Sequence, residues 1–121
     1  MANSYRELKV WQTSVDLAEK IYIATGTFPP SEIYGLTSQL RRASVSIPSN
    51  IAEGWGRRSR KEYGGFVLVA QGSNDELQTQ LIIAARLKFG GQTLLSEAAS
   101  LSQEIGRMLQ GLHAYLQQPK K

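Results

Sequence analysis

Apolar residues recur at intervals of three and four along almost the whole chain, which is the spacing of one face of an α-helix. Four such stripes are separated by short breaks rich in glycine and proline, near residues 26–30, 54–56 and 90–91. No stretch alternates apolar and polar residues in the manner of a half-buried strand. The pattern predicts an all-α protein in which four helices share one apolar core.

The predicted helices cover residues 4–25, a segment that begins between residues 31 and 37, residues 60–89, and a last segment from residue 92 or 93. Because the breaks are short, we expect an antiparallel up-down-up-down bundle, with residues 1–121 forming a single domain. The predicted core stripe of the first helix is Leu8, Trp11, Val15, Ala18 and Tyr22, widened by Leu17 and Ile21. That of the third helix is Phe66, Ala70, Ser73, Leu77 and Leu81.

Pro48 interrupts the predicted second helix. It has no backbone N–H for the carbonyl of residue 44 and its ring pushes against that carbonyl, so we expect the helix to kink or end near Ser46 or Ile47. Further on, Ser59 followed by Glu62 has the spacing of a capping box, which predicts the start of the third helix.

A polar stripe runs along the same second helix. Its members follow a helical period and are Gln39, Arg42, Ser46, Asn50 and Glu53. Since half-buried polar groups need partners, we interpret the stripe as structural, with Arg42 paired to Glu53 or Asn50. Small residues in the third helix, Gly72 and Ser73, are interpreted as a place where a neighbouring helix approaches closely.

Positive charge is concentrated in residues 39–61. The stretch holds six of the fourteen lysine and arginine residues and one of the ten acidic residues, a formal charge of +5 against −1 for the rest of the chain. Arg57, Arg58, Arg60 and Lys61 lie within five consecutive positions, and an anionic partner would relieve their mutual repulsion. The cluster is either a surface for a polyanion or an ordinary solvated loop. Trp55 beside it fits a stacked base, a subunit contact or simple packing.

Composition excludes several kinds of chemistry. Without cysteine and with one histidine, the chain lacks the residues of disulfide frameworks and of the usual zinc and di-iron sites. The carboxylates of Glu53, Asp75 and Glu76 have no visible nucleophile or base beside them, so we expect a protein that is not an enzyme and binds no metal or cofactor. With no apolar signal core and no membrane-spanning run, we expect it in the cytoplasm and not in a membrane.

Several runs also carry a resemblance to a known family: LKVWQ at residues 8–12, FPP at 28–30 followed by Glu32, YGLTSQLRRASVSIPSNIAEGWGR at 34–57, GSNDELQTQL at 72–81, and RML-x-GL at 107–112. Over nearly its whole length the chain resembles the 23S rRNA intervening-sequence proteins. The positions that match the family pattern are Gln39, Arg42, Ser46, Pro48, Asn50, Glu53, Gly54, Gly72, Ser73 and Glu76. Asn74, where the family usually has leucine, and Gly64 with Gly65 depart from it, which bears on the packing of the third helix.

The resemblance implies a left-handed antiparallel four-helix bundle that assembles into a ring, commonly a homopentamer, with a basic surface around its axis. The chain is also similar to the accessory proteins of diversity-generating retroelements, which bind nucleic acid and a reverse transcriptase.

Two functions are consistent with these observations. The leading hypothesis is an oligomeric bundle that binds nucleic acid, structured RNA more than DNA, through phosphate contacts from Arg41, Arg57, Arg58, Arg60 and Lys61. The rival is a scaffold that binds an acidic protein partner, such as a reverse transcriptase or a ribosome-associated protein, without touching nucleic acid.

Overall fold

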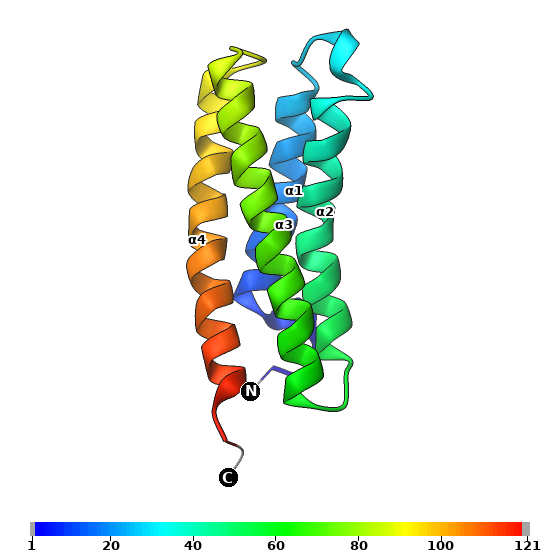
Figure 1. Ribbon diagram of the computed structural model, residues 1–121, viewed down its shortest axis with the longest axis vertical. Coiled ribbons are helices and arrows are strands. Elements are labelled where there is room, and N and C mark those ends of the chain that lie inside the picture. Colours follow the sequence, from blue (N-terminus) through cyan, green and yellow to red (C-terminus); the bar gives the residue numbers. More distant parts are fainter. Residues whose placement is uncertain (1, 120–121) are drawn as a thin grey trace.

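Four long helices form an antiparallel bundle in the computed structural model, which describes residues 2–119 (Figure 1). They are α1 (Lys9–Thr25), α2 (Leu36–Trp55), α3 (Arg60–Arg86) and α4 (Gln92–Gln117), with two short 3-10 helices, η1 (Tyr5–Glu7) and η2 (Pro30–Glu32). The helix α2 packs against α1 and α3, and α4 packs against α3 and α1, so the four helices occupy the corners of a square. The predicted up-down-up-down four-helix bundle is confirmed. Its handedness stays a prediction.

Pro48 lies inside an unbroken α2. The prediction that the helix ends near Ser46 or Ile47 is wrong, because the helix continues to Trp55. Ile47 and Ile51, on either side of the proline, are fully buried. Burial of two such side chains contributes about 1.5–3 kcal/mol each, which offsets the roughly 3 kcal/mol that an interior proline costs a helix. A kink at Pro48 stays a prediction.

The core face of α1 is rotated from the predicted stripe. Val15 and Tyr22 are 39% and 47% exposed, whereas Leu17, Ile21 and Ser14 are fully buried. The Ser14 hydroxyl tolerates burial because it donates to the backbone carbonyl one turn earlier, at 2.6 Å. The predicted core positions Leu17 and Ile21 are therefore confirmed, whereas Val15 and Tyr22 are wrong and the polar Ser14 joins the core.

A buried polar pair joins α3 to α4. Asn74, which is only 1% exposed, donates from Nδ2 to the backbone carbonyl of Ser102 at 3.0 Å. The Ser102 hydroxyl donates to Oδ1 of Asn74 at 2.6 Å. The core face of α3 thus includes Asn74 beside Val67 and Leu77, while the predicted members Phe66 and Ser73 are only half-buried.

At the end of the bundle where α3 gives way to α4, the connection requires a left-handed backbone. Gly90 has a φ of 69°, and a Cβ atom there would lie 2.5 Å from the Thr27 hydroxyl. The backbone N–H of Gly91 donates to the same hydroxyl at 3.3 Å, and Phe28 packs against Phe89 with ring centroids 5.8 Å apart. These contacts fasten the two loops of this end to each other. The helix α3 ends at Arg86 because Lys88 already has a left-handed φ of 59°, which lets the N–H of Phe89 donate to the Ala84 carbonyl at 3.0 Å.

The α1–α2 loop carries a projecting knob at the same end. Tyr34 is 94% exposed and Ile33 beside it is 49% exposed. Since α2 begins two residues later and runs the length of the bundle, this knob lies at the opposite end from the α2–α3 loop (Figure 1).

Candidate nucleic-acid interface

The basic cluster lies on the short loop between α2 and α3 and on the first turn of α3. Before this loop, Gly54 lets the last turn of α2 pack closely on α3, because a Cβ atom there would lie 2.8 Å from Cβ of Phe66 and from Cδ1 of Tyr63. The side chain of Ser59 accepts from the N–H of Glu62 at 3.1 Å, which confirms the predicted start of α3. The packing at Gly54 and the cap at Ser59 therefore hold the loop at both of its ends.

Two arginines of the cluster are seated on aromatic rings. The guanidinium of Arg57 lies 4.7 Å from the centroid of the Phe66 ring and pairs with Oε2 of Glu53 at 2.7 Å. That of Arg60 lies 4.6 Å from the centroid of Tyr115 and donates to the backbone carbonyl of Gln118 at 3.0 Å. Each of these hydrogen bonds uses one of the five N–H donors of a guanidinium, so both arginines are positioned while most of their donors stay available.

Arg58 and Lys61 complete the cluster and are exposed. Within residues 2–119 neither side chain makes a hydrogen bond or an ion pair with another residue. Both charges are therefore open to solvent.

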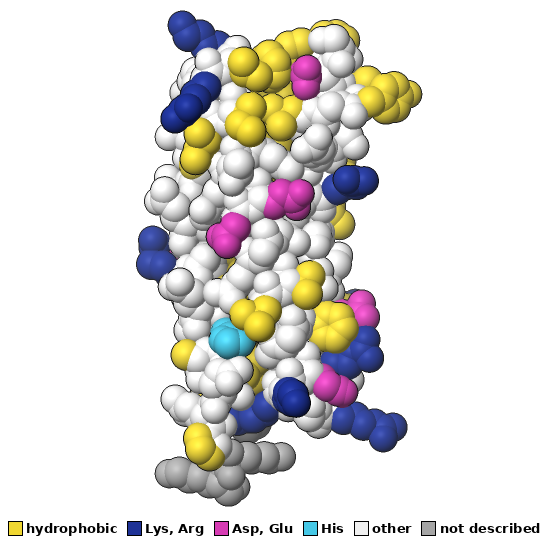
Figure 2. Space-filling model, in the orientation of Figure 1, with side chains coloured by type: hydrophobic (Ala, Val, Ile, Leu, Met, Phe, Trp, Pro, Cys, Tyr) yellow, Lys and Arg dark blue, Asp and Glu magenta, His cyan; other side chains and the backbone are white. Residues whose placement is uncertain are grey.

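The N-terminal segment adds charge to the same end of the bundle, where residues 2–9, 53–62 and 113–119 meet (Figure 1). We call this region the basic end; its cationic residues are Arg6, Lys9, Arg57, Arg58, Arg60 and Lys61. Three carboxylates, those of Glu7, Glu53 and Glu62, lie among them. Figure 2 shows several dark-blue side chains gathered at the lower end of the face in view.

Arg41 does not join the basic end. Fourteen helical positions separate it from Trp55, where α2 ends, which is about 21 Å along the axis at 1.5 Å per residue. Its Nε atom donates to the Thr25 hydroxyl at 2.9 Å, and its guanidinium lies 4.6 Å from the centroid of Tyr22. Arg41 therefore ties α2 to the end of α1, and its phosphate contact stays a prediction for a separate surface.

The polar stripe of α2 has partners different from those predicted. Glu53 pairs with Arg57, and Asn50 donates to the backbone carbonyl of Ser46 at 2.8 Å. The pairing of Arg42 with Glu53 or Asn50 is wrong, because these residues lie eleven and eight positions further along the helix, about 16 and 12 Å away.

Two other members of the stripe connect α2 to α3. The hydroxyls of Ser46 and Ser73 lie 2.8 Å apart, and Gln80 donates to Oε1 of Gln39 at 3.4 Å. The close approach predicted at Ser73 is thus present, whereas at Gly72 it is wrong, since no neighbouring atom lies within 4 Å of where a Cβ would be.

Tyr63 packs under the cluster with its hydroxyl buried. That hydroxyl has no hydrogen-bond partner among the described residues. Desolvation by burial raises the pKa of Tyr63 above its ordinary value. The ring centroids of Trp55 and Tyr63 lie 6.3 Å apart in an edge-on arrangement. Trp55 is therefore packed on one side, and it is half-buried.

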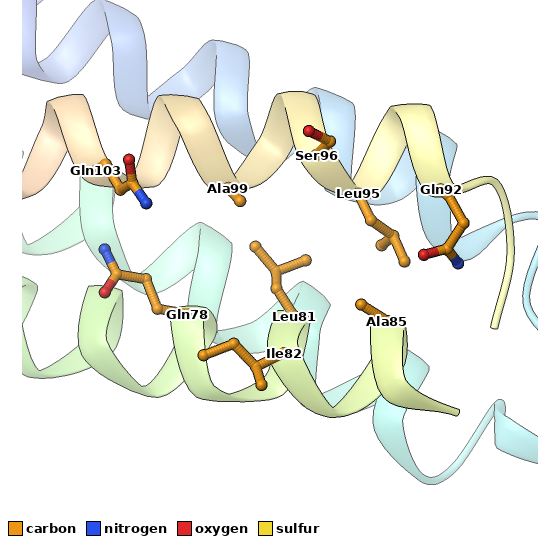
Figure 3. A pocket seen from close by; sticks show the side chains of 9 residues that line it. All are labelled: Gln78, Leu81, Ile82, Ala85, Gln92, Leu95, Ser96, Ala99 and Gln103. Atoms are coloured by element: carbon orange, nitrogen blue, oxygen red, sulfur yellow. The ribbon is translucent and has the colours of Figure 1, made fainter. Parts of the chain in front are cut away.

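A separate apolar groove of about 250 Å³ lies between α3 and α4, in the half of the bundle near their connection (Figure 3). Leu81 and Ala85 of α3 point toward Leu95 and Ala99 of α4, Ile82 also lines the groove, and glutamines border it. No titratable side chain lines it. The groove therefore fits an apolar binding partner better than it fits a catalytic site.

Two further properties concern the whole described chain. Across residues 2–119 no three histidine, cysteine or acidic side chains are grouped so that they would hold a metal ion. None of the helices in that range combines the length and apolar character needed to cross a membrane.

The fold defines the class of protein as an antiparallel four-helix bundle. A solved structure from Bacteroides thetaiotaomicron, described as a protein with unknown function from the S23 ribosomal protein family, has the same fold with a TM-score of 0.77. It is 20% identical, and the match covers 86% of this chain and 97% of that one. A comparison with curated proteins finds no match.

A family model described as 23S rRNA-intervening sequence protein matches residues 6–111. The chain therefore belongs to the 23S rRNA-intervening sequence protein family, as its sequence runs predicted. The similarity to the accessory proteins of diversity-generating retroelements stays a prediction.

The sequence alone identifies the cationic residues of the basic end between positions 57 and 61. It does not identify the aromatic rings and hydrogen-bond acceptors that hold two of them in place. Tyr115 and Gln118 lie more than fifty positions from Arg60, and no local pattern links them to it. The helical period places Phe66 in the core, although its ring supports Arg57 at the surface.

Proposed function

We propose that this protein binds nucleic acid through its basic end and performs no chemistry on it, with structured RNA favoured and DNA open. The observation that carries the proposal is the construction of the cluster. Arg57 and Arg60 are held on aromatic rings, while Arg58 and Lys61, each next to one of them in sequence, are exposed and make no hydrogen bond or ion pair within residues 2–119. Cations held in advance lose less conformational entropy when a phosphate arrives. Such contacts fix position and carry little sequence information.

We also propose that the protein acts as a homo-oligomer, with five subunits expected from the family resemblance. The outer face of α3 supports association, because Leu68, Val69, Ile82 and Ile83 are about half exposed along it. Several copies of the basic end on one assembly would bind a long polyanion with avidity. A monomeric mass in light scattering at micromolar concentration would contradict this part of the proposal.

The direct test is binding of nuclease-treated protein to labelled structured RNA and duplex DNA across a salt series. The basic-end variant carries Arg57→Ala, Arg58→Ala, Arg60→Ala and Lys61→Ala. A control with the same change in charge, placed away from the basic end, carries Lys20→Ala, Arg42→Ala, Arg86→Ala and Arg107→Ala.

For the wild type we expect affinity to fall steeply with salt. The basic-end variant should flatten the slope of log K against log salt by about 0.9 for each duplex phosphate that it no longer neutralises, because fewer counterions are released. The control variant should keep most of the wild-type slope. Equal slopes for the two variants would show that net charge and not the basic end governs binding.

A second candidate function is a scaffold for an acidic protein partner, such as a reverse transcriptase or a ribosome-associated protein. The apolar groove between α3 and α4 favours it, since a protein surface fills such a groove better than a phosphate backbone does. A scaffold of this kind would purify with a low ratio of absorbance at 260 nm to 280 nm. A nucleic-acid binder would carry nucleic acid and lose it in high salt.

A further inference from the structure

A hollow of about 310 Å³ opens beside the basic cluster, on the outer face of the first turns of α3. Its lining is mostly apolar and consists of Arg57, Glu62, Gly65, Phe66 and Val69. The space exists because residue 65 has no side chain: a Cβ atom there would meet no other atom within 4 Å. At the lower limit of the usual size of ligand sites, the hollow suits one small planar group.

Arg57 gives the hollow a flat, charged wall. Its guanidinium lies over the Phe66 ring and is held by Glu53, so the plane of the wall is fixed from two sides. Guanidinium planes and aromatic rings are the surfaces on which unpaired bases of nucleic acids stack. Glu62 also lines the hollow, and its carboxylate is an acceptor for the amino groups that adenine, guanine and cytosine present.

We propose that this hollow receives one unpaired nucleobase of a bound strand while Arg58 and Lys61 hold the neighbouring phosphates. The inference rests on the proposed function and deepens it, because it names single-stranded segments, such as the loops of a structured RNA, as the preferred target. A base in the hollow adds stacking to a contact that is otherwise purely electrostatic.

Charge distinguishes this occupant from a second copy of the chain. Another subunit of a ring would bring a different surface of the chain to Arg57, Arg58 and Lys61, and the residues outside 39–61 carry a formal charge of only −1 in all. A nucleotide brings a phosphate to the same three cations. The hollow and its surroundings therefore match a nucleotide better than they match another subunit.

The test compares two labelled RNA strands of twelve nucleotides, one of adenosines and one that is abasic, by fluorescence anisotropy with the full chain. The strands carry the same number of phosphates and differ only in their bases. We expect the wild type to bind the adenosine strand at least about 5-fold more tightly than the abasic strand, the lower limit for stacking of one base.

Gly65→Leu fills the hollow and should bring this preference close to one. Gly72→Leu is the matched control, because Gly72 is also an exposed glycine of α3 at which an added Cβ would meet no atom within 4 Å, and it lies outside the hollow. The control should keep the wild-type preference. Circular dichroism checks that both variants stay helical.

The outcomes separate the inference from the proposed function. Equal, salt-sensitive binding of both strands by the wild type would overturn the inference and leave the proposed function standing. Binding of neither strand would overturn both. A Gly65→Leu protein that keeps its preference for the adenosine strand would also overturn the inference. If that protein in addition has a lower mass in light scattering, the hollow belongs to a subunit contact.

Discussion

Removing the Ser102 hydroxyl should show how strongly the buried polar pair binds α3 to α4. In Ser102→Ala, Oδ1 of Asn74 loses the hydroxyl that donates to it at 2.6 Å. The other hydrogen bond survives, because Asn74 donates it to the backbone carbonyl of residue 102. Since Asn74 is 1% exposed, water does not replace the missing donor.

The expected cost follows from this geometry. A buried acceptor left without a donor lowers the free energy of unfolding by about 1–3 kcal/mol. Asn74→Leu should cost a similar amount, because the Ser102 hydroxyl then loses its acceptor. In the double variant both polar groups are gone and an apolar contact replaces them, so its loss should be smaller than the sum of the single losses by at least about 1 kcal/mol.

Urea unfolding followed by circular dichroism measures these free energies at one fixed protein concentration, since association would contribute to apparent stability. In thermal unfolding, each kcal/mol corresponds to about 3–6 °C in Tm for a chain of this size. Ser100→Ala, at an exposed serine of the same helix, is the matched control and should change stability by less than about 0.5 kcal/mol. Additive losses in the double variant would refute the claim that the two side chains depend on each other.

Two further predictions concern the packing under the basic end. Gly54→Ala should lower the free energy of unfolding by about 1–3 kcal/mol, because its Cβ would lie 2.8 Å from Phe66, whereas Gly111→Ala, with open space around it, should raise it by about 0.5–1 kcal/mol; equal effects in urea unfolding would contradict this. Tyr63→Phe should leave stability at pH 7 unchanged or raised, because the hydroxyl has no hydrogen-bond partner within the described chain. The pKa of Tyr63 is raised in the folded protein, so the unfolded chain ionises first and wild-type stability should fall above about pH 10; a variant that loses stability as steeply as the wild type in that range would show that Tyr63 is not the cause.

The bundle could be predicted because the helical period of the apolar residues and the positions of the glycine- and proline-rich breaks both indicate four helices. Ser59 caps α3 as expected where local chemistry decides the backbone, whereas the left-handed residue that closes α3 is Lys88 and not one of the glycines at 90–91. The direction of each core face was less predictable. Ser14 and Asn74 are buried because partners within and between helices satisfy them, and a count of apolar residues does not register such partners.

The candidate site was predictable only as far as it is continuous in sequence. Residues 57–61 form the basic cluster by adjacency, but the ring of Tyr115 reaches Arg60 through the packing of α4 on α3. Proximity in sequence groups Arg41 with the cluster, although fourteen helical positions, about 21 Å, separate it from the end of α2. Helix geometry settles such distances once the limits of α2 are known.

The exposed Tyr34 is a suitable position for a fluorescent label. The chain contains no cysteine, so Tyr34→Cys would introduce a single thiol that a maleimide dye modifies at one defined site. The position is almost fully exposed and lies at the end of the bundle away from both described termini and the basic end. Energy transfer between dyes on mixed donor and acceptor subunits would then report assembly while the basic end stays free for RNA.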